Sequence, residues 1–255
     1  MIDIHIHVLP GVDDGAKDMA EAVEMCRLAF EDGCTALVAA PHMLDGMFDV
    51  PPEKALKGAA ELRAELARRG LPLGVELGAD VHIASDLPGL VRSGKVLTVA
   101  GKKRHLMVEL PRDVLPLGLE GMLFALRLAN VTPIITHPER NLEVQRAPDL
   151  LVPLVEEGNL VQITAGSLTG DFGDAPERCS EELVVRNLAH FVASDAHSAT
   201  RRRPGMSRAR RRVEELLSAA AAEEFFVLRP QRVLAGESVA VPEVVAKKKK
   251  RWFFW

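Results

Sequence analysis

The sequence predicts an α/β fold in which a parallel β-sheet is covered by helices, with a number of units close to that of a TIM-like barrel. Three observations support this prediction. Seven short apolar runs rich in Val and Ile alternate with stretches of helical periodicity. The apolar runs are hydrophobic nearly throughout, as expected of strands that are buried on both faces. No interior linker and no repeat of fixed length divides the chain in two.

The predicted elements alternate along the chain. The strands cover residues 1–6, 35–42, 73–81, 105–110, 132–137, 160–164 and 190–195. The helices lie between most of them, over residues 17–33, 53–70, 116–130, 148–158 and 178–189. The first helix carries an apolar stripe and ends at Gly33, a common helix stop.

The composition indicates a globular domain with an acidic body and a basic end. Hydrophobic residues make up 47% of the 255 residues, which is ample for a core, and the net charge is −4. The last nine residues, "KKKKRWFFW", carry five positive charges and no negative one. An acidic body argues against nonspecific binding of nucleic acid. We expect a domain over residues 1–241 and a basic-aromatic tail over residues 242–255.

The sequence also predicts a cytoplasmic protein. No apolar run approaches the roughly 20 residues needed to span a bilayer. The N-terminus shows neither the basic nor the apolar region of a signal peptide. Cys26, Cys34 and Cys179 are an odd number without paired spacing, which fits a reducing compartment.

Metal-ligand residue types gather where the predicted strands end. His5 and His7 share one face of the first strand, because side chains alternate along a strand. The other strand ends carry His42, Asp80, Glu109, His137, Asp195 and His197. The carboxyl ends of parallel strands in a barrel form one mouth, where active sites are built. We therefore expect these side chains to converge.

Structural interpretations compete with this one. A single histidine such as His42 is more often a satisfied polar residue, and we interpret His82, His105 and His190 in that way. Asp14 has the alternative role of capping the helix that follows. Burying so many ionisable groups without a cation would, however, cost many kcal/mol. Two or three divalent ions resolve that cost, and mixed imidazole and carboxylate ligands suit Mn, Zn or Fe.

Several motifs identify a resemblance. The segments "HIH", "PH", "HPERN" and "SDAH", together with Glu109, resemble the polymerase and histidinol phosphatase (PHP) family. More narrowly, "MIDIHIHVLPGVDDGAKD", "ITAGSLTGDFG" and "FVASDAHS" are similar to bacterial manganese-dependent protein-tyrosine phosphatases of capsule and exopolysaccharide operons. The resemblance covers essentially the whole chain. It implies the PHP fold, a distorted seven-stranded (β/α) TIM-like barrel with a trinuclear metal centre.

The resemblance also implies a ligand set. It assigns His5, His7 and Asp195 to one ion, Glu109 and His137 to a second, Asp14, His42 and His197 to a third, and Asp80 to a bridge between the first two. The family usually has Glu at the bridging position, whereas this chain has the shorter Asp80 in "GAD". Glu76, four residues earlier and nearer the start of the strand, is a less favoured substitute.

Basic residues near these motifs are candidates for binding phosphate. Arg140 in "HPERN" lies three residues beyond a predicted ligand. In "RRRPG", spacing favours Arg202 and the Arg-Pro context favours Arg203. Lys17 in "DDGAK" is a candidate for binding phosphate or assisting the leaving phenolate. The alternative for each of these four basic residues is that it is an exposed surface charge without a role in the site.

The mechanism implied by these residues is metal-dependent hydrolysis of a phosphomonoester. A divalent ion lowers the pKa of water, which then attacks phosphorus in line near neutral pH. Thiol chemistry is not expected, because none of the three cysteines is followed by Arg in the C-x5-R spacing of cysteine-dependent tyrosine phosphatases.

The resemblance implies a phosphorylated, membrane-bound tyrosine kinase as substrate. Two alternatives stay open: a small-molecule phosphatase such as histidinol phosphatase, and a non-catalytic regulator that binds phosphotyrosine or the kinase. The basic-aromatic tail suits the surface of an anionic membrane, while protein docking and an oligomer contact are its alternatives. We expect a cytoplasmic protein that is peripheral to the membrane through this tail, and no nucleic-acid partner.

Overall fold

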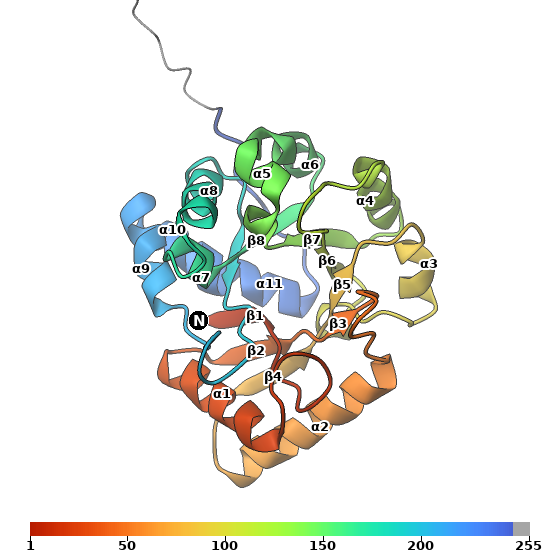
Figure 1. Ribbon diagram of the computed structural model, residues 1–255, viewed down its shortest axis with the longest axis vertical. Helices are drawn as coiled ribbons and strands as arrows, with labels where there is room; N and C mark the ends of the chain where they lie inside the picture. The colour runs from red at the N-terminus through yellow and green to blue at the C-terminus, as the bar shows by residue number, and fades with distance from the viewer. Residues whose placement is uncertain (247–255) are drawn as a thin grey trace, which may run out of the picture.

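The computed structural model describes residues 1–246 and shows an α/β fold with helices around parallel strands (Figure 1). The predicted α/β class with parallel strands is thereby confirmed. The strands in this range are β1 (Ile2–Ile6), β2 (Ala36–Ala39), β3 (His42–Met43), β4 (Gly74–Leu77), β5 (Asp80–His82), β6 (His105–Glu109), β7 (Thr132–Thr136), β8 (Leu160–Thr164) and β9 (Phe191–Ala193). They form two parallel sheets, ordered β1-β2-β4 and β3-β5-β6-β7-β8-β9.

Helices connect the strands and surround them in Figure 1. The α-helices are α1 (Met19–Glu31), α2 (Pro52–Arg68), α3 (Leu87–Arg92), α4 (Leu119–Leu128), α5 (Leu142–Arg146), α6 (Val152–Glu156), α7 (Ala165–Leu168), α8 (Asp174–Val185), α9 (Ser207–Leu216), α10 (Ala219–Glu223) and α11 (Arg229–Ala235). Short turns of other helical types are η1 (Val99–Gly101), η2 (Pro138–Arg140), η3 (Pro148–Leu151) and the π-helical η4 (Glu224–Leu228).

Two of the seven predicted strands are each divided in the structure. The segment 35–42 becomes β2 and β3, interrupted at Ala40 and Pro41, because proline has no N–H to donate to a ladder. The segment 73–81 becomes β4 and β5, interrupted at Gly78 and Ala79. A Cβ on Gly78 would lie 3.0 Å from Val38 Cγ1, so a glycine permits this close approach.

Backbone contacts place the first strand beside the last. Ile6 forms a parallel bridge with Ala196 just after β9. The N–H of His7 donates to the carbonyl of Ala196 at 2.9 Å, and the N–H of Asp195 donates to that of His5 at 2.9 Å. These bonds join the ends of β1 and β9 at the point where both segments carry predicted ligands.

The strand register aligns the predicted ligands in rows. His42 pairs with Asp80 across β3 and β5. Two residues beyond Asp80, His82 pairs with Glu109, Glu109 with Thr136, and Thr136 with Gln162. The apolar residues of the strands are buried, and the strand centres Ile4, Met107 and Ile134 are inaccessible to solvent. The buried core therefore lies beneath the carboxyl ends of the strands, where the polar candidate ligands are placed.

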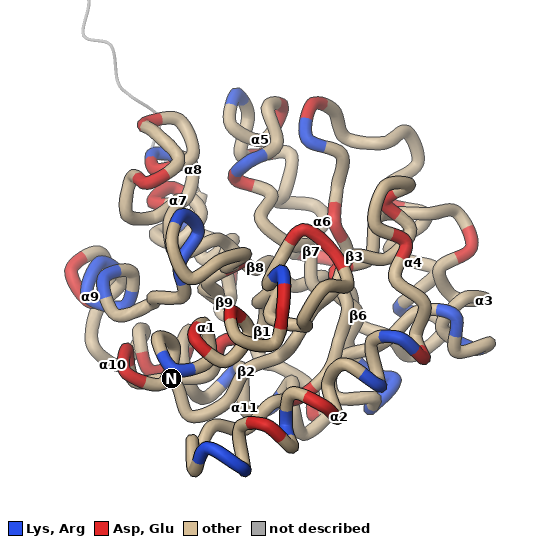
Figure 2. The backbone as a smooth tube through the Cα atoms, turned by 60° about the horizontal axis from the view of Figure 1, so that its bottom comes forward, with Lys and Arg blue, Asp and Glu red and all other residues tan. Residues whose placement is uncertain are grey.

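Helix boundaries follow local capping. The first predicted helix begins at Met19, with the Asp18 side chain accepting from the Glu21 N–H. Asp14 is thus not the cap that one alternative proposed. The predicted helix over 148–158 divides into η3 and α6, which contain Pro148 and Pro153. Basic and acidic residues are interspersed on outer helices such as α2 (Figure 2).

The C-terminal segment is attached near the amino ends of the strands. The Val245 N–H donates to the Arg186 carbonyl at 2.9 Å, and Asn187 Nδ2 donates to the Glu243 carbonyl at 2.9 Å. Arg186 and Asn187 lie between α8 and the start of β9, at the end of the sheet opposite to the predicted ligands. Residues 247–255 of the predicted tail lie outside the described residues. No helix within residues 1–246 is long and apolar enough to span a membrane.

Candidate metal centre

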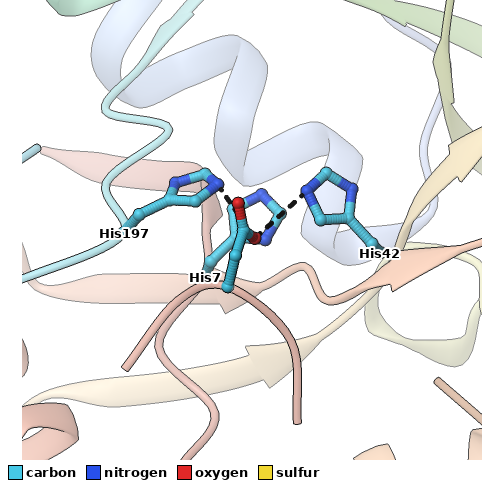
Figure 3. A group of neighbouring side chains, drawn as sticks. His7, His42 and His197 are labelled. Carbon is cyan, nitrogen blue, oxygen red and sulfur yellow. Dashed lines mark ion pairs between the residues drawn. The ribbon is translucent and has the colours of Figure 1, made fainter. Parts of the chain in front are cut away.

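Two imidazoles face each other at the end of β1. His5 and His7 are buried, and their Nε2 atoms lie 3.1 Å apart. Two imidazole nitrogens at this distance, both directed inward, are suited to bind a common cation. Figure 3 shows the ring of His7 converging with those of His42 and His197, with dashed lines for the ion pairs of the latter two. These pairs run to Asp14 Oδ1, at 3.4 Å from His42 Nε2 and 3.5 Å from His197 Nε2.

All nine predicted ligands belong to groups whose donor atoms lie within 4.8 Å of one another. The groups are His7/Asp14/His42/His197, His5/His7/Asp80, His5/His137/Asp195 and His42/Asp80/Glu109. Asp14, His42 and His197 come together as the resemblance implies, with His7 in addition. The other groups share members, because Asp80 and His5 each face several neighbours. The structure thus brings the whole predicted set into one connected cluster.

Asp80 lies at the centre of this cluster. Its Oδ2 is 3.5 Å from His5 Nε2, 3.5 Å from His137 Nε2 and 3.9 Å from His42 Nδ1. Burial raises the pKa of this carboxyl, but His5, His137 and His42 outweigh the burial and hold the pKa well below its ordinary value. Asp80 is therefore a carboxylate. Glu76, the less favoured substitute, is exposed on β4 and lies 4.0 Å from Arg63.

The donor set fits divalent metal ions. Asp80 Oδ2 and His42 Nδ1 are buried atoms without a hydrogen-bond partner, and a buried polar atom without a partner is costly. Both atoms belong to the same group of three, with Glu109 Oε2 3.6 Å from His42 Nδ1. A cation in this position would satisfy both. Nitrogen and oxygen donors without a thiolate are the ligands that Mn, Zn and Fe accept.

Two of the predicted ligands lie on unusual backbone. His137 has φ 34° and Asp195 has φ 48°, in the left-handed region that residues with a Cβ rarely adopt. Such conformations cost on the order of 1–3 kcal/mol each and occur mainly at functional sites. The His137 N–H is held by the Gln162 carbonyl at 2.7 Å, and the Asp195 N–H by His5 as described above. These bonds keep both side chains turned into the cluster.

Three partners of the ligands were missed by the sequence analysis. Gln162 Oε1 lies 2.8 Å from His5 Nδ1, and Asp13 Oδ2 lies 3.0 Å from His7 Nδ1. The Thr136 hydroxyl donates to Asp80 Oδ1 at 2.9 Å. Such contacts fix the ring orientation and leave Nε2 of each histidine directed at the cluster. The available signal was a lone polar residue inside the apolar run "LVQIT" and the first Asp of "DDG".

Two of the candidate arginines reach the cluster. Arg140 Nη1 donates to Asp195 Oδ2 at 2.6 Å, and Arg202 Nη2 donates to the same oxygen. We call Arg140 and Arg202 the arginine pair. Arg203 is exposed and outside the pocket lining, so of the two alternatives in the "RRRPG" run only Arg202 reaches the cluster. Lys17 is likewise exposed and outside the pocket lining.

A pocket of about 590 Å³ opens over the cluster. Its polar wall includes the arginine pair, Glu109, His137 and Asp195, and its apolar wall includes Met47, Phe48, Leu110, Pro111 and Phe172. His82, interpreted from the sequence as structural, also lines it, with Nδ1 3.9 Å from Glu109 Oε2. The pocket has the size of a small-ligand site with an apolar side and a charged floor.

The other two histidines interpreted as structural lie outside the pocket lining. His190 Nδ1 accepts from the Val161 N–H at 2.9 Å, and burial with the nearby Arg229 charge lowers the pKa of His190 to about 3. Burial, assisted by Arg104, lowers the pKa of His105 to about 4. Both rings are therefore neutral near pH 7.

Comparisons with known proteins identify related chains. A family profile described as capsular polysaccharide synthesis, CpsB/CapC, matches residues 1–235. Tyrosine-protein phosphatase YwqE of Bacillus subtilis (strain 168) is 39% identical over 202 residues, 79% of either chain. CapC of Staphylococcus aureus is 34% identical over 255 residues, 99% of either chain. A crystal structure from work on YwqE of Bacillus subtilis and CpsB of Streptococcus pneumoniae, described as unique metal-dependent tyrosine phosphatases, superposes with a TM-score of 0.92 at 34% identity, covering 97% of this chain and 100% of that one.

Proposed function

This chain belongs to the CpsB/CapC family of capsular polysaccharide synthesis, and on that premise we propose that it is a metal-dependent protein-tyrosine phosphatase. The observation that carries the proposal is the convergence of nine imidazole and carboxylate ligands beside two arginines in one pocket. The relatives named tyrosine-protein phosphatases support the substrate class.

We propose that His5, His7, Asp14, His42, Asp80, Glu109, His137, Asp195 and His197 hold two or three divalent ions, with manganese as the first candidate and zinc or iron as alternatives. When bound, such ions supply a nucleophile from water and neutralise charge on phosphoryl oxygens. The carboxylate of Asp80 faces imidazoles of three strands, which suits a bridging ligand.

The arginine pair is proposed to bind the phosphoryl group. Each guanidinium presents several N–H donors in a plane, and charged hydrogen bonds to phosphate oxygens are strong. In hydrolysis, water attacks phosphorus while the bond from phosphorus to the phenolic oxygen breaks. The tyrosine leaves with a proton, and inorganic phosphate remains. Arg140 and Arg202 stabilise the negative charge on the transferring group during this step.

No thiol is needed in this reaction. Cys26, Cys34 and Cys179 are buried, and burial raises the pKa of Cys26 and of Cys179 to about 12. A thiol with such a pKa is protonated near neutral pH and is a poor nucleophile. None of the three lines the pocket over the ligand cluster.

We also interpret the two sheets as parts of a distorted seven-stranded barrel. The interpretation treats β2 with β3, and β4 with β5, as two interrupted strands. The Ile6–Ala196 bridge then lies where the last strand meets the first. In this arrangement all ligands lie at the carboxyl ends of the strands, where (β/α) barrels carry their active sites. We further treat residues 1–241 as the catalytic domain.

The substrate is proposed to be a phosphorylated tyrosine kinase, with the protein at the cytoplasmic side of the membrane. The tail sequence "KKKKRWFFW" supplies cations for anionic lipids, each worth about 1 kcal/mol near the surface. Changing Trp252, Phe253, Phe254 and Trp255 to Ser should release the protein from anionic vesicles. Unchanged vesicle sedimentation in that variant would exclude the aromatic contact.

The test of the proposed function is a substrate panel with controlled metal loading. The purified protein is stripped with a chelator and assayed on a phosphotyrosine peptide, a phosphoserine peptide and histidinol phosphate, with Mn, Zn, Fe or Mg added back. We expect metal-dependent release of phosphate from the phosphotyrosine peptide and its loss in His5→Ala. Activity on histidinol phosphate alone would show a metabolic phosphatase, and bound metal without hydrolysis would show a non-catalytic regulator. Asp80→Glu, run in parallel, measures what the shorter bridge costs.

A further inference from the structure

Phe172 contacts both members of the arginine pair. The ring lines the pocket, with Arg140 Cζ 5.1 Å and Arg202 Cζ 5.9 Å from its centroid. Guanidinium groups within about 6 Å of an aromatic face are attracted to it. One ring therefore contacts two guanidinium groups from distant parts of the chain: Arg140 from η2 and Arg202 from the loop before α9.

The loop between α7 and α8 is folded around this ring. A Cβ on Gly166 would lie 2.9 Å from Phe172 Cε2, so any other residue at position 166 would require the ring or the loop to shift. The Asp171 N–H donates to the Gly166 carbonyl at 2.8 Å, and the Gly173 N–H donates to the Gly170 carbonyl at 3.0 Å. Gly170 and Gly173 have φ of 81° and 90°, which glycine adopts readily. These features fix the position of Phe172 rather than leaving it on an open loop.

Helix α9 supports the same loop from outside the pocket. Arg208 Nη1 donates to Asp171 Oδ1 at 3.3 Å, and its Nη2 donates to the Thr169 carbonyl at 3.2 Å. Helices α7, α8 and α9 lie together on one side of the molecule in Figure 1. The ring is thus held by contacts that do not involve the metal ligands.

The carboxylate of Asp195 has two roles, one toward the arginine pair and one toward the ligand cluster. Both guanidiniums donate to its Oδ2, but Asp195 is also a proposed metal ligand, with Oδ1 3.5 Å from His7 Nε2. Its charge is therefore shared between the ligand cluster and the arginines. The ring of Phe172 is an uncharged contact that does not compete for metal or for phosphate.

We propose that Phe172 is a positioning residue that aligns Arg140 and Arg202 for binding of a phosphoryl group. The proposal rests on the proposed function, because it assigns the arginine pair to the phosphoryl group of the substrate. Arginine side chains have many rotamers, and a contact that orders them beforehand reduces the entropy lost on binding. Removing the ring should weaken phosphate binding without removing metal.

The test measures binding of inorganic phosphate to the manganese-loaded protein by calorimetry. Phe172→Leu should raise the Kd for phosphate about fivefold, from the usual strength of a partly desolvated cation–π contact, with metal content and Tm unchanged. Phe172→Tyr should restore the wild-type Kd, because it restores the ring. Arg208→Gln, which loosens the loop from outside, should raise the Kd in the same direction. Phe124→Leu is the matched control, because Arg127 Cζ lies 5.5 Å from that ring on α4, outside the pocket lining.

Hydrolysis of the phosphotyrosine peptide is measured in parallel, so that the two proposals can fail separately. If wild-type protein hydrolyses the peptide and Phe172→Leu binds phosphate as tightly as wild type, the positioning role is overturned and the phosphatase stands. If no phosphoester is hydrolysed but phosphate binds and Phe172→Leu weakens it, the positioning role stands and the phosphatase fails. Absence of phosphate binding in the wild type, or an equal loss in Phe124→Leu, overturns the positioning role.

Discussion

The hydroxyl of Thr136 donates a 2.9 Å hydrogen bond to Oδ1 of Asp80, and this bond leaves only Oδ2 of the central carboxylate directed at the imidazoles. Both residues are inaccessible to solvent. One oxygen of the proposed bridge is therefore oriented by the protein, and the other faces the ligand cluster.

Thr136→Val should weaken metal binding while leaving the fold intact. Outer partners of metal ligands typically contribute about 10–100-fold in affinity or activity. The expected result is a metal affinity lower by about tenfold, measured by competition with a chromogenic chelator. Thr132→Val is the matched control, because Thr132 begins the same strand away from the ligands. Equal affinity in wild type and Thr136→Val would show that the hydroxyl does not orient the carboxylate.

Gly15→Ala should disturb the first strand end. A Cβ at this position would lie 2.1 Å from the His7 carbonyl oxygen, which requires the loop or His7 to move. Overpacking of this kind costs about 3 kcal/mol, so the free energy of unfolding should fall by that amount together with metal content. Gly121→Ala in α4, where a Cβ meets no atom within 4 Å, should instead raise stability by about 0.5–1 kcal/mol. Denaturant unfolding compares the two.

His5→Ala should remove metal, whereas His105→Ala should not. Both residues are buried on strands, but only His5 Nε2 lies in the cluster of ligands. We expect His5→Ala to lose at least about one ion per chain in elemental analysis and to lose activity by more than the roughly 10–100-fold typical of outer partners of ligands. A full metal complement in His5→Ala would contradict the assignment of the first strand end.

Alkylation of thiols should leave the activity unchanged. The three cysteines are buried and their pKa values are raised by burial. The folded, metal-loaded protein treated with iodoacetamide should keep its hydrolytic rate, while a chelator should abolish it. Inactivation by iodoacetamide at the rate of a reactive thiolate would point to a thiol mechanism instead.

Stability should fall at acid pH partly because of His190. Burial, with a smaller contribution from Arg229, lowers the pKa of His190 to about 3 in the folded protein, against about 6.5 in the unfolded chain. Between these values only the unfolded state binds the proton, so the free energy of unfolding rises with pH by about 1.4 kcal/mol per unit from this residue. His190→Asn should flatten the pH profile of unfolding in that range by this slope. The same slope in both proteins would show that His190 is not buried in its neutral form.

The sequence was sufficient to predict the α/β class with parallel strands and the convergence of the candidate ligands. Periodicity locates strands, and strands of a parallel sheet end on one side, so His5, Asp80 and Asp195 could be placed together without coordinates. Pairings across strands could not be predicted, because Gln162 and Thr136 act through neighbours that depend on strand order and register. The conflict between spacing, which favoured Arg202, and the Arg-Pro context, which favoured Arg203, could not be resolved from the sequence, since the path of the loop after Asp195 decides which side chain turns inward.

If the proposed membrane contact forms, the attachment of residues 243–245 at the amino ends of the strands determines which end of the sheets faces the lipid. A tail that continues from this end and binds lipid would direct the pocket away from the bilayer. Strands of five residues alone span roughly 16 Å, so a phosphotyrosine must reach at least that far from the lipid before it can enter. Phosphotyrosines on long, flexible segments of a membrane protein would meet this requirement. Phosphotyrosines close to the bilayer would not reach the pocket and would not be hydrolysed. Distance from the membrane would then contribute to the choice of substrate.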